Sequence, residues 1–144
     1  MSEAETTEKA APAKKAGKPA PAKPNYSRRT LRKMGREKTM LNQKELYPDL
    51  YDLSVGYLFG EIWSRGHLTL RERELITMAC NICMARPNGT HSHYRSAKHL
   101  GINHEEIMEL IIQVGHYAGW PAMAHAIIQY DEVLKEDAAK EKKK

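Results

Sequence analysis

Two helical sequence patterns separated by one short break constrain this chain more than any other feature. The first pattern starts at Thr69, and Glu72 has the spacing of a capping box, in which side chain and backbone satisfy each other's polar groups at a helix start. Residues 75–85 are apolar almost all round, which predicts a buried helix. Pro and Gly within residues 86–89 end it, and a second helix is expected over about 90–99.

Chemically reactive side chains gather on both sides of this break. They are one carboxylate, two thiols and three imidazoles: Glu74, Cys80, Cys83, His91, His93 and His99. The two thiols followed by two imidazoles could be zinc ligands, but histidines separated by one residue diverge on a helix. Both cysteines lie inside the predicted helix and not at its N-terminus, so we favour core packing over redox chemistry or metal binding. For His93, the spacing leaves a structural and a functional role both open.

The rest of the chain continues the helical pattern. No segment alternates between apolar and polar residues as a strand does, and no hairpin turn signal or internal repeat is present. In the helix expected over about 48–63, Leu50, Leu53 and Tyr57 fall on one apolar stripe. We therefore predict an all-α fold of about five or six helices. Besides the central pair, they are expected over about 28–45, 48–63, 103–118 and 121–134.

The two ends of the chain differ in composition from its middle. Residues 1–27 are rich in Ala, Lys and Pro and have no apolar periodicity, which predicts disorder. Such a basic tail binds nucleic acid in some proteins, but no aromatic residues interleave these lysines for stacking, so we favour a solubilising extension. One helical domain is expected over 28–137, followed by a solvated Lys-rich C-terminus, 138–144.

Nothing in the sequence marks the chain for secretion or for a membrane. No apolar segment follows the first charges, as it would in a secretory signal, and early acidic residues argue against a transit peptide. No apolar run approaches the length that spans a bilayer. The two cysteines, expected to be reduced, suit a cytoplasmic protein that contacts no membrane.

Four motifs occur in a fixed order along residues 45–135. They are Gly60-Glu61-Ile62-Trp63 before a loop, Glu74 on the central helix, His93 with Ala97 and Gly101 four and eight residues beyond it, and Tyr117-Ala118-Gly119-Trp120-Pro121. As a set they resemble the carboxymuconolactone decarboxylase family, whose members also include alkylhydroperoxidase D-like proteins. The resemblance implies an all-helical homo-oligomer, a trimer or a hexamer, with active sites at or near subunit contacts.

The chain departs from the peroxidase branch of that family. In that branch a Glu precedes a Cys-x-x-Cys pair that ends four residues before the His. Counting back from His93, those positions hold Arg86 and Gly89, and Cys80 and Cys83 lie six residues upstream of them. A peroxidase is therefore the disfavoured alternative. A non-catalytic helical oligomer that binds nucleic acid through its basic tail is a further alternative.

The decarboxylase branch fits the residues better. Resemblance to it implies action without metal or organic cofactor on a carboxylated lactone from aromatic-acid breakdown, in the beta-ketoadipate pathway. His93 is the expected general acid, because an imidazole ordinarily titrates near working pH. Glu74 is expected to orient it or shuttle the proton in a shared, sheltered cavity, and Glu61 is a second candidate. The expected substrate-binding residues are two arginines that bind carboxylate and two apolar walls, Arg95, Arg65, Trp63 and Trp120.

Overall fold

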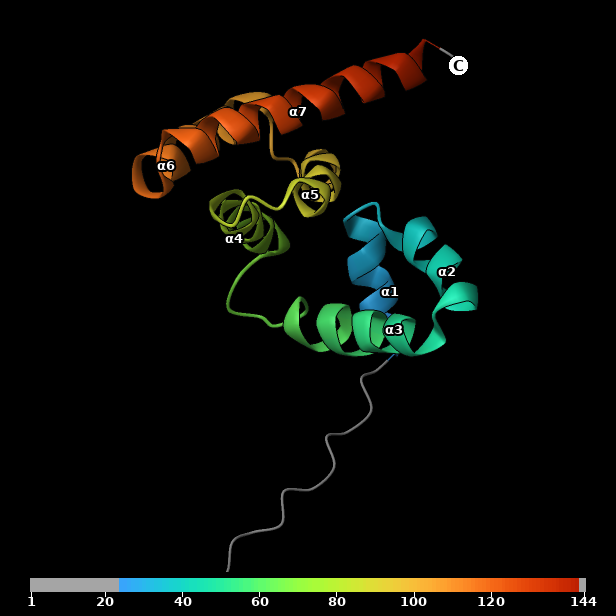
Figure 1. Ribbon diagram of the computed structural model, residues 1–144. Coiled ribbons are helices and arrows are strands. Elements are labelled where there is room, and N and C mark those ends of the chain that lie inside the picture. The colour runs from blue at the N-terminus through green and yellow to red at the C-terminus, as the bar shows by residue number, and fades with distance from the viewer. Residues whose placement is uncertain (1–23, 143–144) are drawn as a thin grey trace, which may run out of the picture.

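A computed structural model describes residues 24–142, and within this range every regular element is a helix (Figure 1). The predicted all-α class is confirmed. The prediction of a disordered tail concerns residues 1–27, of which 1–23 lie outside the described range and 24–27 begin the first helix. The elements are α1 (Pro24–Lys33), α2 (Glu37–Leu46), α3 (Pro48–Asp52), η1 (Leu53–Ile62), α4 (Leu70–Cys83), α5 (Pro87–His99), α6 (His104–Ala118) and α7 (Trp120–Glu141).

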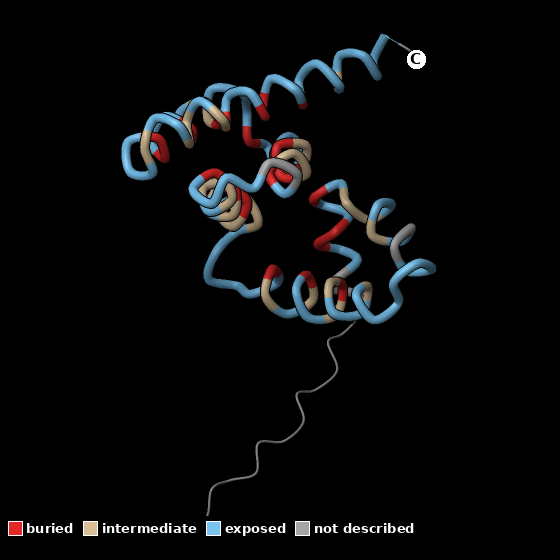
Figure 2. Tube along the Cα trace, viewed as in Figure 1, coloured by how far each residue is buried: buried red, intermediate tan, exposed pale blue. Residues whose placement is uncertain are grey.

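The helices form two groups, each with its own core of buried apolar residues. Helices α4 and α5 lie between the α6–α7 pair and the part built from α1, α2, α3 and η1 (Figure 1). Buried positions lie on the sides of the helices that face one another (Figure 2). The α4–α7 core includes Met78, Tyr94 and Ile111, whereas the second core joins α1 to η1 through Leu31, Met34, Val55, Phe59 and Trp63. The half-buried Leu100 packs against both cores.

Local signals in the sequence set the helix starts. The capping box predicted at Thr69 and Glu72 is present, with both reciprocal hydrogen bonds formed. Asn103 and Glu106 form a second one at the start of α6. Helix α5 begins at Pro87, three residues earlier than predicted, because proline is favoured in a first helical turn. None of the described helices has the combination of length and apolar character that crossing a bilayer requires.

The single helix predicted over 28–45 is wrong, because the chain turns a corner at Gly35 and forms α1 and α2 instead. Gly35 has φ +67°, a left-handed conformation that costs other residues free energy. A Cβ atom at this position would also lie 2.4 Å from the ring of His99. The corner therefore lets the chain pass close to α5, and the next residue, Arg36, reaches that helix.

Helix α4 is buried on one side only, contrary to the prediction. Glu74, Met78 and Ile82 face inward, four residues apart. Cys80 and Cys83 are exposed, so the expectation that they pack in the core is wrong. An apolar helix surface predicts burial, but none of the described elements covers this outer side of α4.

The inner face predicted for residues 48–63 is also wrong. Leu50, Leu53 and Tyr57 are exposed, and Val55 and Phe59 face the core instead. For Leu53 and Tyr57 the reason is geometric, since both lie in Leu53–Ile62, which winds as a π-helix with hydrogen bonds five residues apart. A face derived from the period of an ordinary helix therefore rotates away from the core.

Candidate functional site

The carboxylate of Glu74 and the imidazole of His93 meet inside the fold. Glu74 lies on the inner side of α4 and is 0% exposed, while His93 lies on α5 and is 8% exposed. Their atoms Oε1 and Nδ1 are 2.8 Å apart, the distance of a good hydrogen bond. The two helices pack against each other, so the pair is fixed by the backbone as well as by this contact.

Trp63 covers one face of the imidazole. The ring centroids of Trp63 and His93 are 6.1 Å apart and the planes differ by 17°, which is a stacked arrangement. Trp63 is itself buried and packs against Phe59 at the end of η1. With Nδ1 occupied by Glu74, the other ring nitrogen, Nε2, has no bonding partner among the described residues. It is therefore the nitrogen able to exchange a proton with a ligand.

A positive charge lies near the pair and comes from an element outside it. Arg36 donates from Nε to the hydroxyl of Ser96 at 2.7 Å and from Nη2 to that of Ser92 at 3.0 Å. Burial lowers the pKa of Arg36, and attraction by the carboxylate of Glu74 works against this lowering. The second carboxylate oxygen of Glu74 is buried and has no hydrogen-bond partner in the described residues.

Sequence reasoning missed Arg36. The sequence predicted a continuous helix through it, which would carry its side chain past α5. The available signal was the glycine before it, since Gly35 permits a corner.

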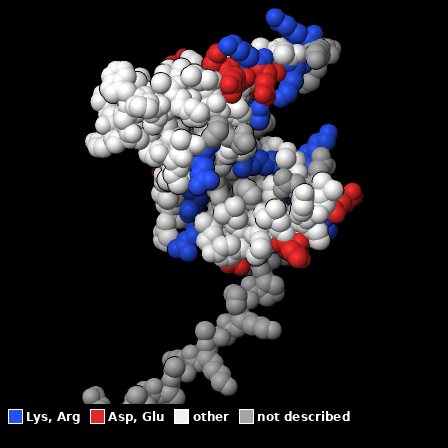
Figure 3. Space-filling view, viewed as in Figure 1, with Lys and Arg blue, Asp and Glu red and all other residues white. Residues whose placement is uncertain are grey.

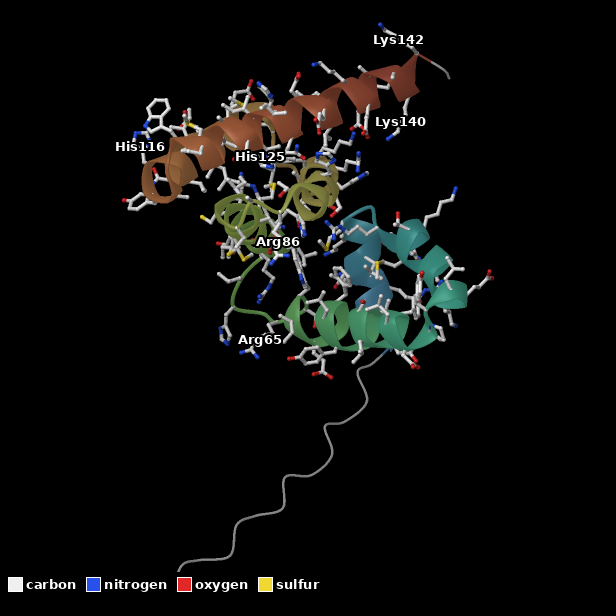
Figure 4. All side chains as sticks on the ribbon, in the orientation of Figure 1. Arg65, Arg86, His116, His125, Lys140 and Lys142 are labelled. Atoms are coloured by element: carbon white, nitrogen blue, oxygen red, sulfur yellow. The ribbon has the colours of Figure 1, made fainter. Side chains whose placement is uncertain are left out.

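Three of the four predicted substrate residues line cavities near the pair. Arg95 lines the same cavity as Arg36, between the α1–α2 corner and α5, and also pairs with Glu136 of α7. Arg65 shares a second cavity of about 180 Å³ with Trp63. Figure 4 shows Arg65 in the segment that leaves the α3–η1 helix. His93 and Glu74 themselves line neither cavity, so neither is the shared hollow that was expected around the pair.

The structure does not bring Glu61 and Trp120 to the pair. Glu61 is exposed on η1. Trp120 is 75% exposed where α7 begins, at the end of the α6–α7 pair that carries His116 in Figure 4. Within the described residues, no hydrogen bond or aromatic contact joins either side chain to His93.

Two other imidazoles lie close to side chains outside the pair. Nε2 of His91 lies 3.2 Å from a carboxylate oxygen of Glu132, and His104 stacks on Tyr130 and lies within hydrogen-bond distance of its hydroxyl. No group of three His, Cys, Asp or Glu side chains suited to a metal ion occurs in residues 24–142.

The thiols face away from the pair. Cys83 follows Glu74 by nine residues on α4, which is two and a half turns at 3.6 residues per turn. The two side chains therefore project from opposite sides of the helix. A proton relay from Glu74 and His93 to the thiol of Cys83 would have to cross helix α4.

Comparison with known proteins places this geometry in a family. The model of the carboxymuconolactone decarboxylase family matches residues 48–132, from α3 into α7, which is more than half of the chain. The chain belongs to the carboxymuconolactone decarboxylase family. It is also 29% identical over 99 residues to 4-carboxymuconolactone decarboxylase from Acinetobacter baylyi, covering 69% of this chain and 74% of that protein.

The family match covers only part of this site. Glu74, His93 and Trp63 lie inside the matched residues, as do Ser92 and Ser96. Arg36 and the whole of α1 and α2 lie outside them. The matched residues therefore include the imidazole–carboxylate pair, whereas Arg36 lies before them in the chain.

Proposed function

We propose that this protein is a decarboxylase that needs no cofactor and acts on a carboxylated lactone like 4-carboxymuconolactone. The observation that carries the proposal is the buried bond between Glu74 and His93, with Nε2 of the imidazole unpaired within residues 24–142. Family membership and the Acinetobacter baylyi relative, which is named for this reaction, support the same chemistry.

In the proposed reaction, the bond between the leaving carboxylate and its carbon breaks. Carbon dioxide departs, and the electron pair passes into the unsaturated lactone. His93 then delivers a proton from Nε2 to the resulting carbanion, and water restores the proton. The hydrogen bond from Nδ1–H to Glu74 holds the ring and its tautomer and offsets the positive charge of the imidazolium.

The residues around the pair support the loss of carbon dioxide as well as the proton transfer. Trp63 covers one side of the imidazole and keeps water from that side, so charge developing nearby is poorly solvated. Arg95 and Arg65 are the proposed ligands for substrate carboxylates. Glu61 and Trp120 keep their proposed roles only through a neighbouring subunit, since both are exposed in the single chain.

An oligomer is part of this proposal. Tyr117 and Trp120 are 85% and 75% exposed, and Leu50, Leu53 and Tyr57 form an exposed apolar stripe on the other group of helices. Apolar areas of this kind on a soluble chain typically mark contacts between proteins. A trimer or hexamer is expected in light scattering at micromolar concentration, and a monomer there would contradict it.

The test compares variants in the conversion of 4-carboxymuconolactone, followed by loss of substrate. His93→Asn is expected to lower kcat by about 10²–10⁴-fold, the usual contribution of a general acid. His91→Asn is the matched control, because His91 lies two residues away and pairs with Glu132. The double variant Cys80→Ala, Cys83→Ala is expected to keep full activity.

Two results would contradict the proposal. One is a wild-type protein that leaves the lactone unchanged under conditions in which the Acinetobacter baylyi enzyme converts it. The other is a His93→Asn variant whose kcat stays within a few-fold of that of His91→Asn. Loss of activity in the cysteine variant would instead favour thiol chemistry.

A further inference from the structure

A cavity of about 280 Å³ lies between the α1–α2 corner and α5. Its volume is near the lower end of small-molecule sites, about 300–1,000 Å³. The polar side chains that line it are three nitrogen bases and three hydroxyls, namely Arg36, Arg95, His99, Thr39, Ser92 and Ser96. Two methionines supply an apolar part, and no acidic side chain is among the lining residues.

Arg36 has unused capacity to bind an anion. A guanidinium has five N–H donors, and the hydroxyls of Ser92 and Ser96 accept only two of these. In the described residues no carboxylate lies within ion-pair distance of Arg36, although burial has removed much of its water. A buried charge without a contacting counter-ion is costly, and an anionic ligand would offset that cost.

Arg95 and His99 also favour an anion in this cavity. The Nε atom of Arg95 is buried without a hydrogen-bond partner, while its Nη2 pairs with Glu136. The ring of His99 lies against Gly35, where no Cβ atom is present to displace it. Figure 3 shows basic side chains gathered in the middle of the drawn face, where the two groups of helices meet.

We infer that this cavity binds an organic acid through a carboxylate held by Arg36, and that the acid is the substrate of the Glu74–His93 pair. Ser92 and Ser96, which anchor Arg36, lie one and three residues from His93 on α5, so the cavity neighbours the pair although His93 does not line it. The second half of the inference rests on the proposed decarboxylase function. The first half does not, because the cavity and its charges exist whatever the reaction.

Arg36 lies outside the residues that the family model matches. The family match begins at residue 48, and Met34–Met40 supply one wall of the cavity. In this inference the α1–α2 corner supplies the arginine that holds the ligand, and the matched helices carry the Glu74–His93 pair. Arg36 is expected to act on KM more than on kcat.

Direct binding tests the inference without any turnover. The probe is adipate, a non-reactive dicarboxylate, and adipamide is its uncharged counterpart; both are titrated into the full chain by calorimetry at low salt. Arg36→Gln is expected to weaken adipate binding by about 10- to 100-fold, the loss of hydrogen bonds between charged groups. Arg32→Gln removes the same charge from the same corner, but its side chain is 74% exposed and pairs with Glu37. It is expected to bind adipate as the wild type does.

A second pair of variants guards against misfolding of the corner. Thr39 is exposed and lines the mouth of the cavity, so substitutions there leave the core intact. Thr39→Glu places a carboxylate beside the arginine and is expected to weaken adipate binding at least tenfold, whereas Thr39→Gln keeps the shape without the charge and is expected to bind normally.

The outcomes separate the two proposals. Adipate binding that depends on Arg36 and Thr39, in a protein that does not convert the lactone, would support the anion site and contradict the proposed function. Equal adipate affinity in Arg36→Gln and Arg32→Gln, equal binding of adipate and adipamide, or no binding at all would overturn the inference, even in an active decarboxylase.

Discussion

Replacing Gly35 by alanine is expected to destabilise the protein through two separate effects. The first is the backbone, because φ is +67° and the left-handed region costs an alanine about 1–2 kcal/mol. The second is the ring of His99, which lies 2.4 Å from the position of the new Cβ atom and must turn away. His99 is exposed and has room to do so, at roughly 1 kcal/mol for a poorer rotamer.

Gly101 is the matched control for the backbone effect. Its φ is +71°, close to that of Gly35, but nothing lies within 4 Å of a Cβ atom there. Gly101→Ala is therefore expected to cost only about 1–2 kcal/mol and Gly35→Ala about 2–3 kcal/mol. At about 4 °C per kcal/mol, the melting temperatures of the two variants should differ by about 4 °C.

Thermal unfolding by circular dichroism, at one protein concentration for all variants, measures the difference. Adding His99→Ala to Gly35→Ala is expected to remove the second effect, since no ring then occupies the space. Equal melting temperatures for Gly35→Ala and Gly101→Ala would refute the reasoning. The reasoning would also be refuted if Gly35→Ala lowered the melting temperature as much in the His99→Ala variant as it does in the wild type.

Two further predictions concern stability. Hydrogen bonds from the backbone N–H and the hydroxyl of Thr69 lower the pKa of Glu72, so this stabilisation is complete above the unfolded pKa of about 4.3 and is lost as pH falls. Glu72→Gln is therefore expected to flatten the dependence of melting temperature on pH between about 5 and 3; an unchanged slope would contradict this. Ile111→Ala, at a site 0% exposed in the α4–α7 core, is expected to lower the free energy of unfolding in urea by about 2–5 kcal/mol, and a loss below 1 kcal/mol would show that the core collapses around it.

The helix class and the central pair were accessible from the sequence because their signals are local. The capping box at Thr69 depends on residues three apart, and the apolar periodicity that places Glu74 on α4 extends over one helix. The resemblance to a family then singled out His93. These features require no knowledge of how distant helices pack.

The other features of the fold and the site depend on packing between distant residues, which no local sequence pattern predicts. The exposure of Cys80 and Cys83 reflects which side of α4 finds a partner, and the π-helical winding of η1 rotates an apolar stripe outward. The role assigned to Arg36 depends on a contact with Ser96, sixty residues along the chain. A charged residue beside a glycine gives no sign of such a contact in the sequence.

The imidazole of His93 lies where the two cores meet. Its carboxylate partner, Glu74, comes from the α4–α7 group, whereas its stacking partner, Trp63, belongs to the core formed by α1 and η1. Cooperative units of a fold can open one at a time, and units with separate cores do so most readily. Opening of the smaller unit would strip Trp63 from His93 and let water reach the acid, while the bond to Glu74 stayed closed. In the proposed mechanism, activity would then be lost well before the protein unfolds.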